Sequence, residues 1–168
     1  VAFENDFANI VQLLQLGKLT LHSSRRHQNE PLVVAGGGAT FLNPEPIAPF
    51  IDLFLLGESE NLLHDFINAW EEVCFDTLSR EEKLSYIARQ VAGSYVPALF
   101  GVKNDDDGRL TDFEPLTDIP KRITVRRATV GKEDPLITQI RTPNTEFANT
   151  TLVEIGRGCG RGCRFCAA

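Results

Sequence analysis

Three of the chain's four cysteines lie within eight residues of one another. Cys159, Cys163 and Cys166 follow the spacing C-x3-C-x2-C in the stretch GRGCGRGCRFC. Cysteine thiolate is the usual ligand of iron–sulfur clusters, so three thiolates on one loop can hold three irons of a [4Fe–4S] cluster. The fourth iron then stays open to a second molecule. These three thiols therefore form the first candidate for chemistry, as a metal site.

Glycines and arginines surround the cysteines. Glycine allows backbone conformations that larger residues resist, and Arg157, Arg161 and Arg164 place positive charge beside the thiols, which favours the thiolate. Two other interpretations stay open: a zinc site completed by a fourth ligand, and an RNA contact made by the arginine–glycine run. The chain has 17 basic and 23 acidic residues, a net charge of −6, which disfavours general nucleic-acid binding.

Composition narrows the class of protein. The hydrophobic fraction of 42% is normal for a globular core. No apolar run approaches the roughly 20 residues that cross a bilayer, and VAFENDFANI lacks the pattern of a signal peptide. We therefore expect a cytoplasmic protein without membrane contact. The sequence contains no methionine, so we also expect a fragment or processed piece of a longer protein.

The segments before the cysteines predict an α/β sheet. Apolar runs at 32–35 and 52–56 each end in glycine, as expected of strands buried on both faces. Repetition of strand, glycine loop and helix predicts an open, Rossmann-like sheet of parallel strands, which binds ligands at the carboxyl ends of its strands. Apolar periodicity predicts three helices, over 6–17, 59–75 and 79–93.

A smaller β region is predicted after this sheet. YVPALFGV, the turn DDDG at 105–108 and KRITVRRATV look like an antiparallel hairpin or meander. TLVEI at 151–155 is a predicted strand that delivers the cysteine loop. We therefore expect three parts: a partial α/β domain over 1–92, a β connector over 93–149, and a first strand with its cluster loop over 150–168.

The cysteine loop resembles the cluster motif of radical S-adenosylmethionine (SAM) enzymes. The stretches FENDF, PLVVAGGGATFLNPEPIAPFIDLFLLGESE and VEIGRGCGRGC are similar to the subgroup with an N-terminal cobalamin-binding-like domain. The resemblance implies that Cys159, Cys163 and Cys166 hold a [4Fe–4S] cluster, that SAM binds the open iron, and that Phe165 packs near its adenine. It also implies that the last strand opens a β/α barrel, that SAM is cleaved to a 5′-deoxyadenosyl radical, and that flavodoxin or ferredoxin supplies the electron.

Gly36, Gly37 and Gly38 are the second group of candidate residues. AGGGAT resembles the glycine pair that lets the backbone approach the nucleotide tail of cobalamin, and a plain turn explains it equally well. The D-x-H-x-x-G motif that supplies cobalamin's histidine ligand does not occur in the sequence, so cobalamin is left open as a cofactor. Glu58 and Glu60 in GESE match the subgroup's next loop, or they begin a helix with acidic residues at its positive end.

The sequence therefore predicts part of a radical SAM enzyme that is inactive by itself, with no catalytic side chain identified and no substrate named. Two alternatives stay open. One is a non-catalytic α/β module that binds cobalamin or a nucleotide, and the other is an interaction domain stabilised by zinc.

Overall fold

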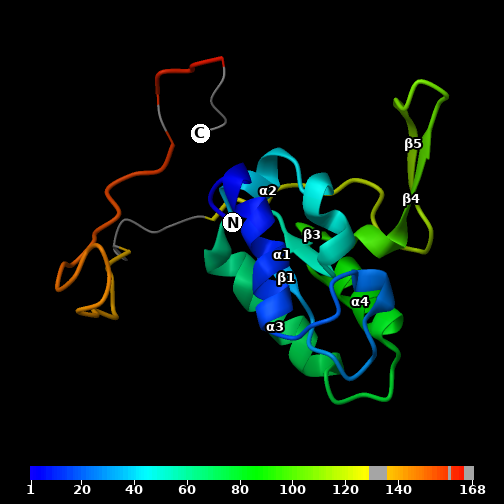
Figure 1. Cartoon of the computed structure of the whole chain (residues 1–168), viewed down its shortest axis with the longest axis horizontal. Helices are drawn as coiled ribbons and strands as arrows, with labels where there is room; N and C mark the ends of the chain where they lie inside the picture. Colours follow the sequence, from blue (N-terminus) through cyan, green and yellow to red (C-terminus); the bar gives the residue numbers. More distant parts are fainter. Residues whose placement is uncertain (129–135, 159, 165–168) are drawn as a thin grey trace. The chain divides into compact units, whose positions relative to one another are not determined.

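The computed structural model describes residues 1–128, 136–158 and 160–164. The chain divides into two compact units, Val1–Ala128 and Thr129–Ala168 (Figure 1). The predicted boundaries after residues 92 and 149 stay predictions.

The first unit contains a three-stranded mixed sheet. Strands β1 (Val34–Gly36) and β2 (Leu53–Leu55) are parallel, with Ala35 opposite Phe54. Strand β3 (Ser94–Tyr95) pairs with β2 in the antiparallel direction, giving the order β1-β2-β3. The α/β class is confirmed, and the expectation that the strands are all parallel is wrong for β3. A chain that returns from helix α4 through a turn at Gly93 reaches β2 from the opposite direction.

Burial of the strands follows their place in the sheet. All three residues of the central strand β2 are buried. Strand β1 is at the edge, and its Val34 is 36% exposed, so the expectation of burial on both faces is wrong there. The residues of the buried core come from positions 35 to 100, and Phe54, Ile47 and Ile87 are among its largest side chains.

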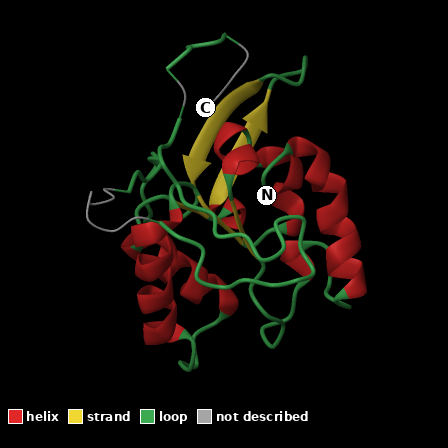
Figure 2. Cartoon of the chain, turned by 90° about the vertical axis from the view of Figure 1, so that its left-hand side faces the viewer, coloured by secondary structure: helices red, strands yellow, loops and turns green. Residues whose placement is uncertain are grey.

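The three predicted helices are confirmed, with small shifts at their ends. Helices surround the strands of the first unit on both sides (Figure 2). The α-helices are α1 (Phe7–Leu16), α2 (Gly38–Leu42), α3 (Ser59–Val73) and α4 (Arg80–Gln90). The first unit also contains four short 3-10 helices: η1 (Glu4–Asp6) directly before α1, η2 (Ser23–Arg25) before β1, η3 (Glu45–Phe50) before β2 and η4 (Pro97–Leu99) after β3.

A two-stranded antiparallel hairpin follows the mixed sheet and projects from the rest of the first unit (Figure 1). It consists of β4 (Phe100–Asn104) and β5 (Leu110–Pro115), joined at the predicted DDDG turn. The segment expected to form its second strand, KRITVRRATV, is not β5. Where the structure describes that segment, it contributes an isolated parallel bridge between Arg126 and Gly57.

An aromatic cluster joins the hairpin to the core. Tyr95 of β3 contacts Phe54, Phe100 and Phe113, and the rings of Phe100 and Phe113 stack with centroids 4.6 Å apart. The Tyr95 hydroxyl donates a hydrogen bond to Glu45 of η3. Burial, together with this bond, raises the pKa of Tyr95 above its usual value.

In the second unit, the described residues pair in one place. Ile137 and Val153 form an isolated antiparallel bridge, and the amides of Thr138 and Glu154 donate to Leu152 and Leu136 at 2.9 Å each. The predicted strand at 151–155 is thus extended and paired around its centre, without forming a longer strand. Across the described part of the chain, no helix has the length and apolar character to cross a membrane.

Candidate functional site

The described part of the cysteine loop is open. Cys163 is exposed and forms no disulfide. Gly158 and Gly162 have φ values of 76° and 60°, a left-handed conformation that favours glycine, and no described residue beyond the chain neighbours lies within 4 Å of a Cβ placed at either. Three other predicted site residues, Cys159, Phe165 and Cys166, lie outside the described residues. The structure therefore shows room around Cys163 but not the arrangement of the three thiols.

An ion pair precedes the loop. The guanidinium of Arg157 donates to both carboxylate oxygens of Glu154, at 3.1 Å for Nη2–Oε2 and with a short Nε–Oε1 contact. Both side chains are about one-third exposed. This bidentate pair links the strand segment to the first glycines of the loop.

The donor set fits an iron–sulfur cluster. Three cysteines on a glycine-rich loop supply thiolate ligands without competing carboxylates between them. Cys163 is exposed, and among the described residues nothing beyond the chain neighbours lies within 4 Å of a Cβ at Gly158 or Gly162, so this part of the loop is open to a bulky inorganic group. Among the described residues, no three His, Cys, Asp or Glu side chains gather as metal ligands.

The predicted glycine loop at Gly36, Gly37 and Gly38 is covered by the chain itself. The amino group of Val1 donates to the Gly36 carbonyl at 2.6 Å, and the Ala39 amide donates to the Val1 carbonyl at 3.3 Å. Gly37 has a φ of 106°, and a Cβ there would lie 2.5 Å from the Val1 oxygen. The close approach that this glycine permits is made by Val1 in this structure.

The second loop at the carboxyl edge of the sheet is also covered by the chain. Arg126 lies beside Gly57, where a Cβ would be 2.4 Å from the Arg126 oxygen. The Glu58 amide donates to that oxygen at 2.9 Å, and the Ala128 amide donates to the Glu58 carboxylate at 2.6 Å. Sequence reasoning assigned no role to Arg126, because its partners are about 70 residues away along the chain.

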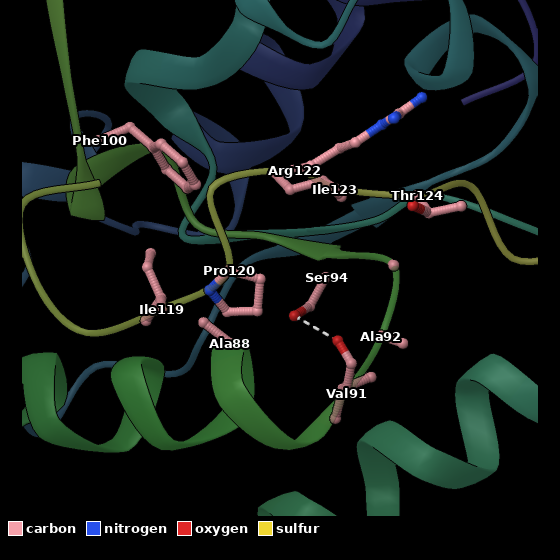
Figure 3. Close-up of a pocket in the computed structure, with 11 residues that line it drawn as sticks. Ala88, Val91, Ala92, Ser94, Phe100, Ile119, Pro120, Arg122, Ile123 and Thr124 are labelled. Atoms are coloured by element: carbon pink, nitrogen blue, oxygen red, sulfur yellow. Dashed lines mark hydrogen bonds between the residues drawn. The ribbon is translucent and has the colours of Figure 1, made fainter. Parts of the chain in front are cut away.

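A small apolar cavity of about 110 Å³ lies between α4, β3 and residues 119–124. Figure 3 shows Ile119 and Pro120 facing Ala88 of α4, whereas Arg122 points away from the cavity. Ser94 donates its hydroxyl to the Val91 carbonyl at 2.7 Å. This lining offers no acid, base or nucleophile in position for a reaction, so we treat the cavity as a packing defect.

A buried charge network lies at the amino end of β2, and sequence reasoning missed it. Asp52, whose side chain is 2% exposed, accepts from Arg26 at 2.7 Å and from Arg80 at 2.9 Å. It also accepts the Val33 amide at 2.8 Å. Arg26 donates further to three backbone carbonyls: Thr20, Leu21 and Phe50. Since every described partner is satisfied and lies at the edge opposite the glycine loops, the network serves the fold.

Comparison with known proteins identifies the family. A family model described as the N-terminal part of radical SAM proteins matches residues 1–97. An uncharacterized protein of Methanocaldococcus jannaschii is 28% identical over 166 residues, which is 99% of this chain and 28% of that protein. The chain thus spans less than a third of the length of this relative. No solved structure gives a significant match.

The region matched by the family model is the α/β part, and the thiol motif follows it in the same chain. More than half of the chain is covered by this match. The chain therefore belongs to the radical SAM proteins, through their N-terminal region.

Proposed function

We propose that the chain forms part of a radical SAM enzyme whose [4Fe–4S] cluster is held by Cys159, Cys163 and Cys166. The observation that carries this proposal is the combination, in one chain, of the family match over 1–97 and the C-x3-C-x2-C loop. Neither feature depends on the other, because the cysteines lie outside the matched region.

The roles of the chain's own residues follow from their chemistry. The three thiolates bind irons and leave one coordination position for SAM. The cluster, when bound, supplies the electron that cleaves SAM to methionine and a 5′-deoxyadenosyl radical. Arg161 and Arg164 would reduce the electrostatic repulsion among the three thiolates. The family resemblance would assign Phe165 to the adenine of SAM. Gly158 and Gly162 provide the left-handed turns with which the loop can wrap an inorganic group.

The first unit is proposed to be a cobalamin-binding-like domain in its fold. Two parallel strands that each end in a glycine loop support this assignment. The mixed sheet continues into a hairpin, so the likeness concerns β1, β2 and the helices that follow them. Fold alone does not assign cobalamin as a cofactor.

The partners are proposed from the family chemistry. A flavodoxin or ferredoxin would deliver the electron, and the proposed location of the enzyme is the cytoplasm. No described residue indicates which substrate would lose a hydrogen atom to the radical.

The test is cysteine replacement in the full-length protein. We expect alanine at position 159, 163 or 166 to abolish both cluster assembly and 5′-deoxyadenosine formation after anaerobic reconstitution. Cys74→Ala is the matched control, because Cys74 ends helix α3, where its thiol donates to the Glu71 carbonyl. The proposal would be contradicted if the unaltered protein, with all three cysteines, purified with stoichiometric zinc and did not accept iron.

A further inference from the structure

Residues 119–128, here called the strap, lead back from the hairpin to the carboxyl end of β2. The Arg126 amide donates to the Leu56 carbonyl at 2.9 Å, and the Glu58 amide donates to the Arg126 carbonyl at 2.9 Å. Arg126 and Gly57 thereby form a parallel bridge. The strap is therefore held by backbone hydrogen bonds to the same loop at which an open α/β sheet would bind a ligand.

Two glycines make the space for Arg126. A Cβ on Gly57 would lie 2.4 Å from the Arg126 oxygen, and a Cβ on Gly93 would lie 2.7 Å from the Arg126 Cγ. Gly57 and Gly93 have φ values of 155° and 92°. Leu56, between them, donates to the Gly93 carbonyl at 2.8 Å. Both glycines thus serve a contact inside the chain.

The side chain of Arg126 adds a further contact. Its Nη2 lies 3.0 Å from Asp65 Oδ2 on α3. The two side chains are 39% and 44% exposed, so this ion pair by itself contributes little. Most of the anchoring comes from the backbone pairing and from the close fit at Gly57 and Gly93.

The strap ends where the first unit ends. Ala128 is its last residue, and its amide donates to the Glu58 carboxylate at 2.6 Å. Everything that follows, including the cysteine loop, is attached to the first unit through this point. The pairing of Arg126 with Gly57, just after β2, thus fixes where the chain leaves the sheet.

We propose that the carboxyl edge of β2 is an anchoring site for the strap and is not a site for cobalamin or a nucleotide, with Arg126 as the positioning residue. The proposal concerns the first unit and does not rest on the cluster chemistry, so either can fail without the other. The glycine loop after β1 agrees with it, because the backbone of Val1 lies against Gly37.

Hydrogen exchange in the 168-residue chain tests the anchoring. We expect slow exchange at the amides of Arg126, Glu58 and Ala128. Gly57→Ala should speed their exchange about tenfold or more while Phe54 and Leu55 stay protected, since the added Cβ displaces the strap but leaves the core. Gly108→Ala is the matched control: Gly108 also has a positive φ, of 78°, but no atom lies within 4 Å of its Cβ position.

Arg126→Ala keeps the test decisive if Gly57→Ala does not fold, because it adds no bulk. It removes the side-chain contacts with Gly93 and Asp65 but keeps the backbone pairing, so it should speed exchange at Glu58 and Ala128 by less than Gly57→Ala does. Arg122→Ala, on the same strap but with a side chain that points away from the cavity (Figure 3), should leave this exchange unchanged. Unchanged exchange in Arg126→Ala would refute the positioning role.

Titration with hydroxocobalamin tests the second half of the proposal. We expect no saturable change in its absorption spectrum with the unaltered chain. Saturable binding would overturn the proposal, as would strap amides that exchange at the rate of an unfolded peptide. Loss of 5′-deoxyadenosine formation in cysteine variants bears on the cluster alone and leaves this result unaffected.

Discussion

Asp52 is the carboxylate on which two arginines converge. Its side chain is 2% exposed and accepts from Arg26, Arg80 and the Val33 amide. Removing it leaves the buried guanidinium of Arg26 without its counter-charge. We expect Asp52→Ala to lower the free energy of unfolding by about 3–5 kcal/mol, as measured by urea denaturation.

The matched control for Asp52 is an exposed ion pair. Asp112 lies 2.9 Å from Lys103 on the hairpin, and the side chain of Lys103 is 76% exposed. Asp112→Ala should lower the free energy of unfolding far less than Asp52→Ala does, because solvent screens the pair. Equal losses for the two variants would contradict the view that burial makes the Asp52 network important.

Glu30 makes the fold sensitive to acid. Its carboxylate accepts the Thr20 amide at 2.9 Å and the His27 amide at 3.0 Å, and these backbone hydrogen bonds lower the pKa of Glu30 to about 2. Because this pKa is lower in the folded than in the unfolded state, the ionised carboxylate stabilises the fold at pH values above 4.5. This stabilisation is lost as the pH falls from 4.5 towards 2.

Replacing Glu30 tests this pH dependence. We expect Glu30→Gln to be less stable at pH 7 and to lose less stability than the unaltered chain between pH 4.5 and pH 2. Thermal unfolding across this range measures both effects. Some acid sensitivity should remain, because the hydrogen bonds from Ser79 also lower the pKa of Glu82. Identical slopes for the variant and the unaltered chain would refute the assignment to Glu30.

At the scale of elements, helix α4 depends on its capping box. The Glu82 amide donates to the Ser79 hydroxyl at 3.2 Å, and the Ser79 amide donates to the Glu82 carboxylate at 2.8 Å. We expect Ser79→Ala to lower the free energy of unfolding by about 1 kcal/mol. Ser79→Thr retains a hydroxyl that can cap the helix, so it should lower the free energy of unfolding much less. Chemical denaturation measures both. A Ser79→Thr variant that loses as much as Ser79→Ala would point to packing and not to the cap.

Elements with local signals could be predicted from the sequence. The helix predicted over 79–93 and the buried apolar run of β2 both depend on neighbouring residues, and both are confirmed. Asp6 lies at the start of α1 as predicted, and its carboxylate accepts the backbone amide of Phe3 and the side-chain amide of Asn9, but no backbone amide of α1.

Elements that depend on distant contacts could not be predicted. Strand β5 reads LTDFEP, with two acidic residues and a proline, a composition that disfavours strands. It pairs because the DDDG turn places it beside β4 and because Phe113 stacks on Phe100. KRITV has a better strand composition, yet it belongs to the strap, where the contact of Arg126 with Gly57 decides its path.

The candidate functional residues also divide into those with a local sequence signal and those that depend on distant contacts. The spacing of Cys159, Cys163 and Cys166 suggests a metal loop without any tertiary information. The roles of Arg126 and Asp52 depend on partners 19 to 70 residues away, and no local pattern marks them. The sequence also could not show that Gly37 and Gly57 contact the chain's own backbone.

At the scale of the whole molecule, the core lies in the first unit. Among the described residues, the buried core cluster comes from positions 35 to 100, and in the second unit Ile155 is 99% and Ile140 81% exposed. The second unit therefore has no apolar core of its own in its described part. A cluster bound to its loop would depend on other protein surfaces for protection from water and oxygen.

Catalysis is expected to need more of the protein than these 168 residues. A β/α barrel typically takes about 250 residues, so residues 129–168 are too few to form one. The Methanocaldococcus jannaschii relative is more than three times as long as the chain. We therefore expect the 168-residue polypeptide, reconstituted anaerobically with iron, sulfide and a strong reductant, to form no 5′-deoxyadenosine from SAM.

The decisive comparison is between this polypeptide and a longer one that includes the segment expected to form the barrel, both prepared without oxygen. The extended protein should retain iron and sulfide and release 5′-deoxyadenosine, because additional walls can bury the cluster and hold SAM against the open iron. The 168-residue polypeptide should lose iron on exposure to air, since the thiol of Cys163 is exposed. Formation of 5′-deoxyadenosine by residues 1–168 alone would show that the loop and the α/β unit already hold SAM in a reactive position.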